Sequence, residues 1–465
     1  MDSKYRWKSL NLQPIVLESL IEEMQDYLIC PFCQSRKILI NHKKVQDRLL
    51  KTSFGGNWNL SSNMYKDGKC NDCKKEFDLL KDLLKLPDYA KYTPLTQKKI
   101  CSANLAKSYD AAAVTLKQQI GLDINKKQVR NISTQVGNYI NLEFKEIYEG
   151  IKNNLTRSEI AKRHPLVDKL KIDKKYFDKS KYLISIAMDG GRMKLFNWIP
   201  NDEDQKQKKN VQWHENKVFR ISIYDKKSLV DLSDDIDGLN QNQKYKCAQI
   251  VPERTVYGAT NVSWKESACL VHSHLYMIGI DLEDVDFCLS DGSDHILNGV
   301  FLTLFPKKLH ILDYYHKSEA LHSCLKSLGL HDNKEINNKL KKFLWEGKIE
   351  DIIRRLKKLQ LEIGFPDKEK KRDAENPKVK LDNLINHLDS NKERLRYKKY
   401  RDMNYPIGSG SIESAVKLFG KRIKGTEKQW NEDGGESILH LYSFLLSKDN
   451  RWDKLWQCQT PWITK

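Results

Sequence analysis

The sequence lacks any apolar run long enough to cross a membrane, and its first residues, Met1 to Gln13, contain no signal-peptide core. It also lacks internal repeats and, outside a charge-rich stretch near 367–380, low-complexity tracts. These absences predict a cytoplasmic protein with no membrane partner. In a reducing compartment the ten cysteines favour metal binding over disulfides.

Acidic residues are outnumbered, with 62 Asp and Glu against 81 Lys and Arg, a formal net charge of +19. Such an excess favours polyanions and predicts salt-sensitive binding to nucleic acid. A solvated basic surface, or a codon bias toward lysine, would produce the same composition, so the charge alone leaves both interpretations open. With 465 residues, 39% of them hydrophobic, the chain is expected to form two to four packed domains.

Two cysteine pairs stand near the N-terminus, Cys30-Pro-Phe-Cys33 and Cys70-Asn-Asp-Cys73. Each pair can present two thiolates to one ion, and the four together complete a tetrahedral Zn²⁺ site. The intervening segment, 34–69, is long for a zinc ribbon, and we expect a hairpin to span it. Pro31 and Gly68 suit tight turns beside the ligands. The alternative is a set of buried cysteines that bind no metal.

Residues 95–140 are predicted to be helical. One helix is expected to begin near Ser108 and to end at Gly121, and Asn125 can cap the next helix, Lys126 to Ile140. This order is typical of a helix-turn-helix, whose second helix contacts bases and phosphates with its first residues. An ordinary helical hairpin would show the same pattern. The candidate DNA contacts are Lys126, Lys127, Gln128 and Arg130.

From about residue 181 the pattern changes to short apolar runs typical of strands. Three meandering strands, then helix, strand, helix and strand, predict an α+β arrangement in which helices cover a mixed sheet. A highly charged helical stretch follows and is expected to be an inserted all-α domain, after which the core resumes at Tyr405. The strands are expected at 181–188, 192–199, 217–224, 285–290 and 309–312, and the helices at 264–278 and 294–304.

Two aspartates follow predicted strands and precede glycines: Asp189 before Gly190-Gly191, and Asp291 before Gly292. A carboxylate at a strand end with glycine beside it leaves room for a metal and a phosphate, although a single Asp-Gly is usually a turn. A third carboxylate, Glu413, lies at the start of a helix opened by Ser409-Gly-Ser411. Three such carboxylates suit two Mg²⁺ (or Mn²⁺) ions that flank a phosphodiester.

The Glu413 helix has two predicted stripes at helical spacing. The core-facing stripe contains Ile412, Val416, Phe419 and Ile423. The other contains Glu413 and three lysines. Beside DNA, Glu413 would hold a metal while the lysines contact phosphates, but a solvated Glu–Lys series explains the spacing equally well, and spacing alone favours it. These lysines are Lys417, Lys421 and Lys424.

Residues 181–456 resemble bacterial insertion-sequence transposases of the Kra-type group, which are related to the Mutator-like transposases. The order of the motifs is more specific than any single one, and the N-terminal segments resemble the family less closely. The motifs are Met188-Asp-Gly-Gly-Arg192, Ser290-Asp-Gly-Ser-Asp294, Leu312-Asp-Tyr-Tyr-His-Lys317, Pro406-Ile-Gly-Ser-Gly-Ser-Ile-Glu-Ser414, Gln429-Trp430 and Arg451-Trp452 to Trp456.

The resemblance implies a ribonuclease-H-like core in which Asp189, Asp291 and Glu413 form a DDE triad. Asp313 and His316 would match the Asp-x-x-His signature of Mutator-like enzymes. His316 would then touch the scissile phosphate or orient a water; the alternative is a structural histidine beside the sheet. Trp430 is expected in the core, with stacking on a nucleobase as the alternative.

The implied activity is Mg²⁺-dependent cleavage and transfer of DNA strands at terminal inverted repeats. The implied partners are double-stranded DNA, at element ends and target, and at least one further copy of the chain. The implied location is a bacterial cytoplasm, at the nucleoid. The rivals are a stand-alone ribonuclease-H-like nuclease, which cuts without joining, and a DNA-binding regulator or inactive transposase relic.

Five segments are therefore expected. They are a zinc-ribbon-like segment at 1–90, a helical, helix-turn-helix-like segment at 91–175, the first part of the catalytic core at 176–316, a helical insertion at 317–402, and the rest of the core, with the Glu413 helix, at 403–465.

Overall fold

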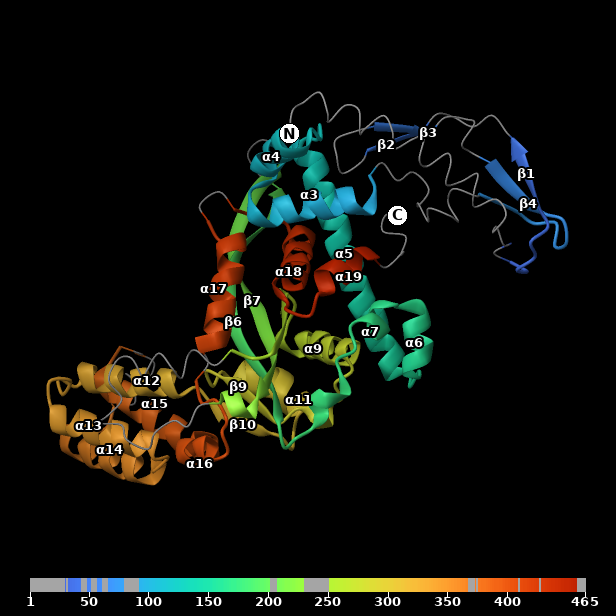
Figure 1. The fold of residues 1–465 in the computed structure, drawn as a ribbon. Coiled ribbons are helices and arrows are strands. Elements are labelled where there is room, and N and C mark those ends of the chain that lie inside the picture. The colour runs from blue at the N-terminus through green and yellow to red at the C-terminus, as the bar shows by residue number, and fades with distance from the viewer. Residues whose placement is uncertain are drawn as a thin grey trace. The chain divides into compact units, whose positions relative to one another are not determined.

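The chain is α+β, as predicted, and the computed structural model contains a five-stranded mixed sheet and many helices (Figure 1). None of the described helices is long and apolar enough to cross a membrane. Parts of some predictions lie outside the described residues: the N-terminal segment before Cys30, Pro31, half of the charge-rich stretch near 367–380, and Ser409. The structure describes residues 30, 32–42, 48–51, 57–60, 66–78, 92–200, 207–229, 251–366, 373, 375–408, 410–425 and 428–457.

The chain divides into two compact units. The first contains residues 1–143, 431–445 and 452–465. The second contains residues 144–430 and 446–451. Each unit is described by itself below.

The second unit is built on a sheet with the strand order β10-β9-β6-β7-β8. Strands β6, β9 and β10 run parallel, and β7 is antiparallel to both β6 and β8. Residues from Asn216 to Tyr224 of β7 and the whole of β9 are buried, so this region forms the core of the unit. The strands are β6 (Tyr182–Pro200), β7 (Gln207–Asp225), β8 (Arg254–Thr260), β9 (Phe287–Ser290) and β10 (Leu309–Leu312).

Two strand predictions were wrong. The runs at 181–188 and 192–199 belong to one continuous strand, β6, and the third meander strand is β8, which sequence analysis did not identify. The expected break at Gly190-Gly191 does not occur because both glycines remain paired, with Lys217 and Asn216 of β7. Their lack of side chains serves a close approach instead of a turn, since a Cβ at Gly190 would lie 2.7 Å from the Glu215 carboxylate.

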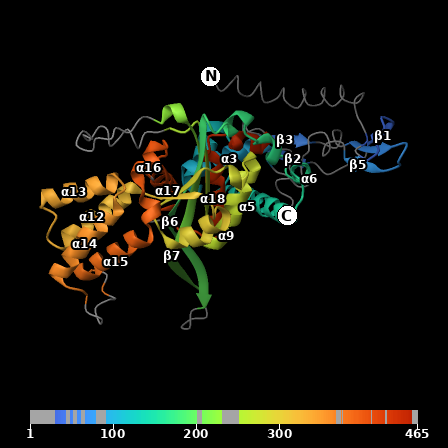
Figure 2. The ribbon, with the colours of Figure 1, turned by 90° about the horizontal axis from the view of Figure 1, so that it is seen from below.

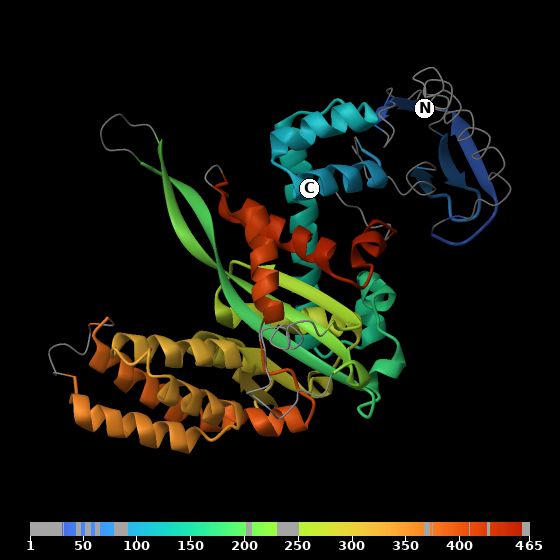
Figure 3. The ribbon, with the colours of Figure 1, turned by 60° about the vertical axis from the view of Figure 1, so that its left-hand side comes forward.

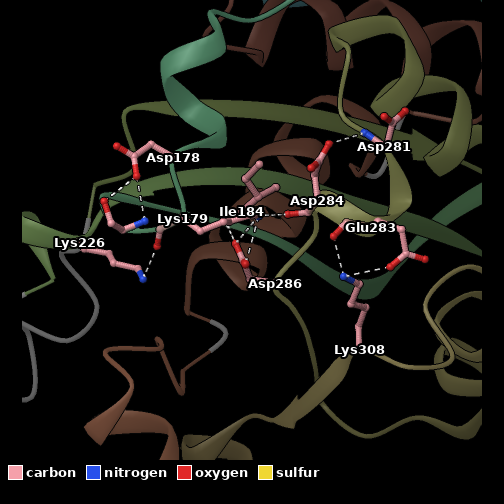
Figure 4. Close-up of polar contacts among 10 residues, drawn as sticks. Asp178, Lys179, Ile184, Lys226, Asp281, Glu283, Asp284, Asp286 and Lys308 are labelled. Carbon is pink, nitrogen blue, oxygen red and sulfur yellow. Dashed lines mark hydrogen bonds and ion pairs between the residues drawn. The ribbon is translucent and has the colours of Figure 1, made fainter.

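Polar contacts join the amino ends of the three parallel strands (Figure 4). The Asp286 carboxylate accepts the backbone N–H of Ile184 at 2.7 Å and lies 3.1 Å from Lys179 Nζ. Lys308, just before β10, donates to the carbonyl of Glu283 at 2.6 Å. These contacts support the register that the backbone ladders of the parallel strands define.

Helices of the second unit follow the sequence pattern closely. The helix predicted at 264–278 is present with those bounds, capped by Ser263 and Glu266. The one predicted at 294–304 is present with a π-helical turn at its centre. The described helical elements of the unit up to β10 are α6 (Arg157–Arg163), α7 (Leu166–Lys169), η2 (Lys174–Phe177), η3 (Lys226–Ser228), α9 (Trp264–Ile278), η4 (Leu282–Asp284), α10 (Asp294–Ile296), η5 (Leu297–Phe301) and α11 (Leu302–Leu304).

The predicted helical insertion is all-α within its described residues and stands to one side of the sheet (Figures 1 and 2). Its first helix begins at Tyr314, earlier than the predicted boundary of 317, because the Asp313 side chain caps it. After it the chain returns to pack α17 along β6. These elements are α12 (Tyr314–Ser327), α13 (Lys334–Trp345), α14 (Ile349–Ile363), α15 (Pro377–Ser390), η7 (Lys392–Leu395), α16 (Tyr397–Asp402) and α17 (Gly410–Ile423).

The first unit combines small antiparallel sheets with helices. Ser108 caps α4 and Gly121 ends it with φ 69°, as predicted. Helix α5, expected to end at Ile140, continues to Lys152 because Phe144 and Ile147 prolong its buried stripe. The elements that lie wholly or mostly in it are β1 (Ile38–His42), β2 (Arg48–Lys51), β3 (Asn57–Leu60), β4 (Lys66–Cys70), β5 (Glu76–Asp78), α3 (Pro94–Ala106), α4 (Tyr109–Ile120), α5 (Lys126–Lys152), α18 (Glu432–Leu446) and α19 (Arg451–Gln457).

Candidate functional site

Three aspartates occupy one row across the parallel strands. The register pairs Ala187 with Leu289, so two residues further along Asp189 lies level with Asp291. In the same way Leu312 pairs with Ser290, and Asp313 therefore lies level with Asp291. Asp291 and Asp313 directly follow β9 and β10, whereas Asp189 lies inside β6, where the sequence had predicted a strand end. The strand order thus places carboxylates more than one hundred residues apart at one edge of the sheet.

The Asp189 carboxyl is largely removed from solvent, and its pKa is raised to about 6, chiefly by burial and then by the negative charges of Asp291 and Glu413. The backbone N–H of Gly190, which donates to Asp189 Oδ1 at 2.7 Å, and the charge of His316 act in the opposite direction. Asp189, Asp291 and Glu413 therefore interact electrostatically, as ligands of shared cations would.

The carboxylate of Glu413 lies in the first turn of α17, next to the first turn of α12. Its Oε1 is 3.7 Å from His316 Nε2, and His316 Nδ1 is 3.5 Å from Asp313 Oδ1. Asp313 is fully buried and accepts the backbone N–H of His316 at 2.6 Å. One ligand atom from each of Asp313, His316 and Glu413 lies within 4.8 Å of the other two.

This grouping differs in detail from the expected triad. In the described part of the chain, Asp189 and Asp291 do not join the closely spaced ligand atoms of Asp313, His316 and Glu413. The Asp-x-x-His turn was anticipated from its motif, but Asp313 was not assigned as a ligand. The carboxylate oxygens of Asp313 and Glu413 suit Mg²⁺ or Mn²⁺, whereas an imidazole nitrogen is not a ligand that Mg²⁺ prefers. A cation bound to the carboxylates would neutralise the negative charge gathered here. The residues present therefore fit a divalent metal.

The motif before Glu413 is joined to the start of α12. The Tyr314 N–H donates to the carbonyl of Ile407 at 2.9 Å. A Cβ at Gly408 would lie 2.7 Å from the Tyr315 ring, so the glycine lets the two segments approach. The Pro406 to Ser414 motif and the Asp-x-x-His turn thus form one local structure.

Lys317 and His387 form a pair beside Asp291 that the sequence did not predict. Lys317 Nζ lies 3.0 Å from Nε2 of His387, a residue of α15 in the insertion. Burial, then the charge of Lys317, lowers the pKa of His387 to about 4, so a neutral His387 accepts a hydrogen bond from Lys317. Lys317 directly follows His316 in the sequence, which could have drawn attention to it. His387 shows no local signal, because only the packing of α15 on α12 brings it here.

A further acid, Glu215, was missed for the same reason. It pairs with Arg192 across the β6–β7 ladder, and its carboxylate lies over Gly190. Glu215 Oε2 also accepts the indole N–H of Trp264 at 2.9 Å. Its position next to Asp189 arises from strand pairing, to which its own sequence neighbours give no clue.

A cavity of about 590 Å³ opens beside two of the carboxylates. Asp189 and Asp291 form part of its wall, and two tryptophans from other elements form another part. Its lining consists of Asp189, Gly190, Gly191, Arg192, Trp213, His214, Glu215, Trp264, Asp291, Ser293 and Ile296.

The helix α17 has the two stripes that its sequence predicts. Ile412, Phe419 and Ile423 are buried, whereas Val416 is only half-buried. The three candidate DNA-contacting lysines, Lys417, Lys421 and Lys424, are exposed. Lys417 Nζ lies 3.7 Å from Glu413 Oε2, the i,i+4 pair that a solvated series would also form.

The two motifs Gln429-Trp430 and Arg451-Trp452 to Trp456 each place a residue in a buried position. Trp430 is buried, as expected, and its indole N–H donates to the carbonyl of Ile423 at 3.1 Å. Arg451 is fully buried and pairs with Asp449 at 2.8 Å, while its Nη1 lies 3.0 Å from His274 Nδ1. Both residues belong to the packed core of the second unit.

The four N-terminal cysteines form one cluster that could bind zinc. Cys30 Sγ lies 3.6 Å from Cys73 Sγ, and Cys33 Sγ lies 3.5 Å from Cys70 Sγ. All four sulfurs are within 4.8 Å of one another. Tetrahedral coordination with Zn–S bonds of about 2.3 Å requires sulfurs about 3.8 Å apart, close to these values.

Both cysteine loops have the same backbone geometry. In each, the residue after the second cysteine, Gln34 or Lys74, has a positive φ and donates its N–H to the carbonyl of the first cysteine at 2.9 Å. The backbone N–H of Cys73, followed by that of Asp72, donates to the Cys70 sulfur and lowers the pKa of Cys70 to about 6. Gly68, predicted to serve a turn, instead lies in β4, which pairs with β1 as the expected hairpin.

The start of α5 displays the candidate helix-turn-helix residues. Lys126, Lys127 and Arg130 are exposed. Gln128 is half-buried and its Oε1 accepts the N–H of Asn125 at 3.0 Å, while Asn125 Oδ1 accepts the N–H of Gln128 at the same distance. Asn125 thus caps α5 as predicted, and the side chain of Gln128 contributes to that cap.

Comparison of the sequence with models of known protein families and with curated proteins finds no match.

Proposed function

We propose that the chain is a DDE-type DNA transposase with a ribonuclease-H-like core. The observation that carries the proposal is the row of Asp189 and Asp291 at one sheet edge, with Glu413 close enough to influence the Asp189 pKa. A mixed sheet with carboxylates on two neighbouring parallel strands and a third on a following helix suits a two-metal phosphoryl-transfer site.

In this proposal Asp189, Asp291 and Glu413 would hold two Mg²⁺ or Mn²⁺ ions. Bound there, the ions would supply activation of an attacking hydroxyl and stabilisation of the leaving oxygen of a phosphodiester. Asp313 caps α12 and, through the contact with His316 Nδ1, holds the histidine toward Glu413. His316 thereby orients the glutamate and presents its imidazole at the scissile phosphate.

Other surfaces support DNA as the substrate. The net charge is +19, and exposed Lys417 and Lys421 follow Glu413 on α17, with exposed Lys424 directly after the helix. In the first unit, Lys126, Lys127 and Arg130 at the start of α5 would contact the terminal repeats. The four-cysteine cluster would hold one structural Zn²⁺. Synapsis of two element ends requires at least two copies of the chain.

The test is an in vitro assay with the full chain, Mn²⁺ and a plasmid carrying the inverted repeats that flank the gene. We expect strand cleavage at the repeat ends and joining of the freed 3′-hydroxyl to target DNA. Asp189→Ala, Asp291→Ala and Glu413→Gln should abolish both steps and leave binding to the terminal repeats largely in place, because the residues proposed to recognise the repeats, Lys126, Lys127 and Arg130, are on another element. Asp178→Asn, at an aspartate that precedes β6, is the matched control and should retain activity.

The outcomes separate the rival functions. Cleavage without joining identifies a stand-alone nuclease. Binding without cleavage by the wild-type protein identifies a DNA-binding regulator or an inactive relic. Wild-type rates in any of the three folded triad variants reject the metal site as assigned.

A further inference from the structure

The strands β6 and β7 continue as a two-stranded ribbon past the rest of the sheet (Figure 3). Strand β9 pairs with β6 only from Ser185 to Ala187, and β8 pairs with β7 only from Lys217 to Ile223. Beyond those positions, the described ladder pairs 192–200 with 207–215, and Trp430 joins it at Leu195. The ribbon therefore extends directly from the candidate metal site, because Asp189 lies on the same strand.

Basic residues far outnumber acidic ones in this ribbon, and two of its aromatic side chains are exposed. Its described residues include Arg192, Lys194, Lys208 and Lys209, whereas Glu215 is the one acidic residue among them. Two large aromatics are exposed to similar degrees, Trp198 at 57% and Trp213 at 56%. A cationic strand pair that exposes indole rings is complementary to a nucleic-acid strand, which carries both phosphates and stacking faces.

The two exposed tryptophans differ in position. Trp213 lines the 590 Å³ cavity together with Asp189 and Asp291, whereas Trp198 is not among the lining residues. Lys194 Nζ lies 5.2 Å from the centre of the Trp213 ring. A second indole in the cavity, that of Trp264, is mostly buried and uses its N–H on Glu215. Trp213 is thus the exposed aromatic surface beside the carboxylates.

The cavity also has the dimensions and polarity of a nucleotide site. Its volume falls within the range of about 300–1,000 Å³ that is typical of small-ligand sites. One wall carries the carboxylates that would hold metal-bound phosphate. Arg192 lines the cavity as well and supplies a guanidinium, a group whose geometry suits phosphate oxygens.

We propose that this cavity binds one unpaired nucleotide of the DNA strand, with the base stacked on Trp213 and its phosphate beside Arg192 and the carboxylates. The proposal rests on the proposed function, because the DNA strand is what brings the nucleotide to the carboxylates. It adds to that function a site that separates the nucleotide next to the scissile phosphate from its base-paired neighbours. The energy of stacking on Trp213 offsets the loss of stacking within the duplex.

The test measures binding of an oligothymidylate of about eight nucleotides to the full chain in buffer containing Ca²⁺, an oxygen-liganded ion. Stacking on an aromatic side chain contributes about 1–3 kcal/mol per base, so Trp213→Ala should weaken binding roughly 5-fold to 150-fold. Trp213→Phe should retain most of the affinity. Trp198→Ala is the matched control, since it removes an equally exposed indole outside the cavity, and should change affinity less than about twofold.

A second measurement locates the base directly. An oligonucleotide carrying 5-iododeoxyuridine should photo-crosslink to Trp213, as mapped by mass spectrometry, and the crosslink should vanish in Trp213→Ala while that variant still binds zinc as the wild type does. Free thymidine monophosphate should compete weakly if the nucleotide is recognised within a strand. Competition as strong as that of the oligonucleotide would mean that the cavity is a site for free nucleotides, which would overturn the proposal.

The outcomes distinguish this site from the function on which it rests. If Trp213→Ala binds the oligonucleotide as tightly as wild type, the nucleotide site is wrong and the transposase proposal stands. Equal losses in Trp198→Ala and Trp213→Ala would mean a general DNA-binding ribbon and would overturn the cavity assignment. If the ribbon variants change self-association instead of DNA affinity, the surface is an interface between copies. If the wild-type chain binds and cuts no DNA, both proposals fail together.

Discussion

The buried Asp189 carboxylate should destabilise the folded, metal-free protein at neutral pH. Its pKa is raised from 3.8 to about 6, chiefly by burial and then by the charges of Asp291 and Glu413. A carboxyl whose folded-state pKa is raised contributes stability below its unfolded pKa, and this contribution is lost as the pH rises through the folded value. The loss should therefore occur between about pH 4 and pH 7.

The size of the effect follows from the shift. About two pKa units correspond to roughly 3 kcal/mol, and remaining solvent contact reduces this to about 1–3 kcal/mol. Asp189→Asn does not titrate and keeps the side-chain shape. The variant should match or fall slightly below wild type near pH 4, and exceed it by about 1–3 kcal/mol near pH 8.

The measurement is urea-induced unfolding of both proteins at several pH values in a metal-free buffer, repeated with Mn²⁺. Bound Mn²⁺ should reverse the order, because wild type gains binding energy that the variant lacks. Asp178→Asn is the control of opposite sign, since the Ser180 hydroxyl and Lys181 lower the pKa of Asp178 to about 2. Its stability difference should appear above about pH 4, with the variant the weaker protein.

Two results would refute the reasoning. The stability difference between Asp189→Asn and wild type could be the same at pH 4 and pH 8. That result would show that burial and neighbouring negative charges do not raise the pKa of Asp189. Failure of Mn²⁺ to stabilise wild type would show that the carboxylates do not bind a divalent ion.

Three further changes test other parts of the chain. Metal analysis should find about one zinc per chain, lost in Cys70→Ser; an unchanged zinc content would reject the four-cysteine site. A triple Ala variant of Lys417, Lys421 and Lys424 should reduce the slope of log affinity against log salt concentration by up to roughly 3 units, and should weaken binding to terminal-repeat and random duplexes equally. An unchanged slope would mean that the lysines are only solvated. His316→Ala should lower the cleavage rate by about a hundredfold or more and weaken Mn²⁺ binding at Glu413, as measured by calorimetry; an unaltered rate and affinity would leave His316 a purely structural role.

Local patterns predicted much of the secondary structure because the interactions involved span only a few residues. Ser263 and Glu266 mark the start of α9, and Gly121 marks the end of α4. The short, continuous apolar runs at 285–290 and 309–312 predicted β9 and β10, and both strands are buried over most of their length. The prediction failed at Gly190-Gly191, because a glycine pair signals a turn unless a partner strand keeps it extended.

By itself the sequence determined which chemical groups are available: two Cys-x-x-Cys pairs, an Asp-x-x-His motif, and a Glu followed by lysines at helical intervals. Each of these groupings involves residues a few positions apart in the chain. Only the tertiary structure decided that Asp189 and Asp291 lie level, because their alignment arises from the pairing of Ala187 with Leu289. The same long-range packing brings His387 to Lys317 and Trp213 to the carboxylates, contacts between residues that share no local pattern.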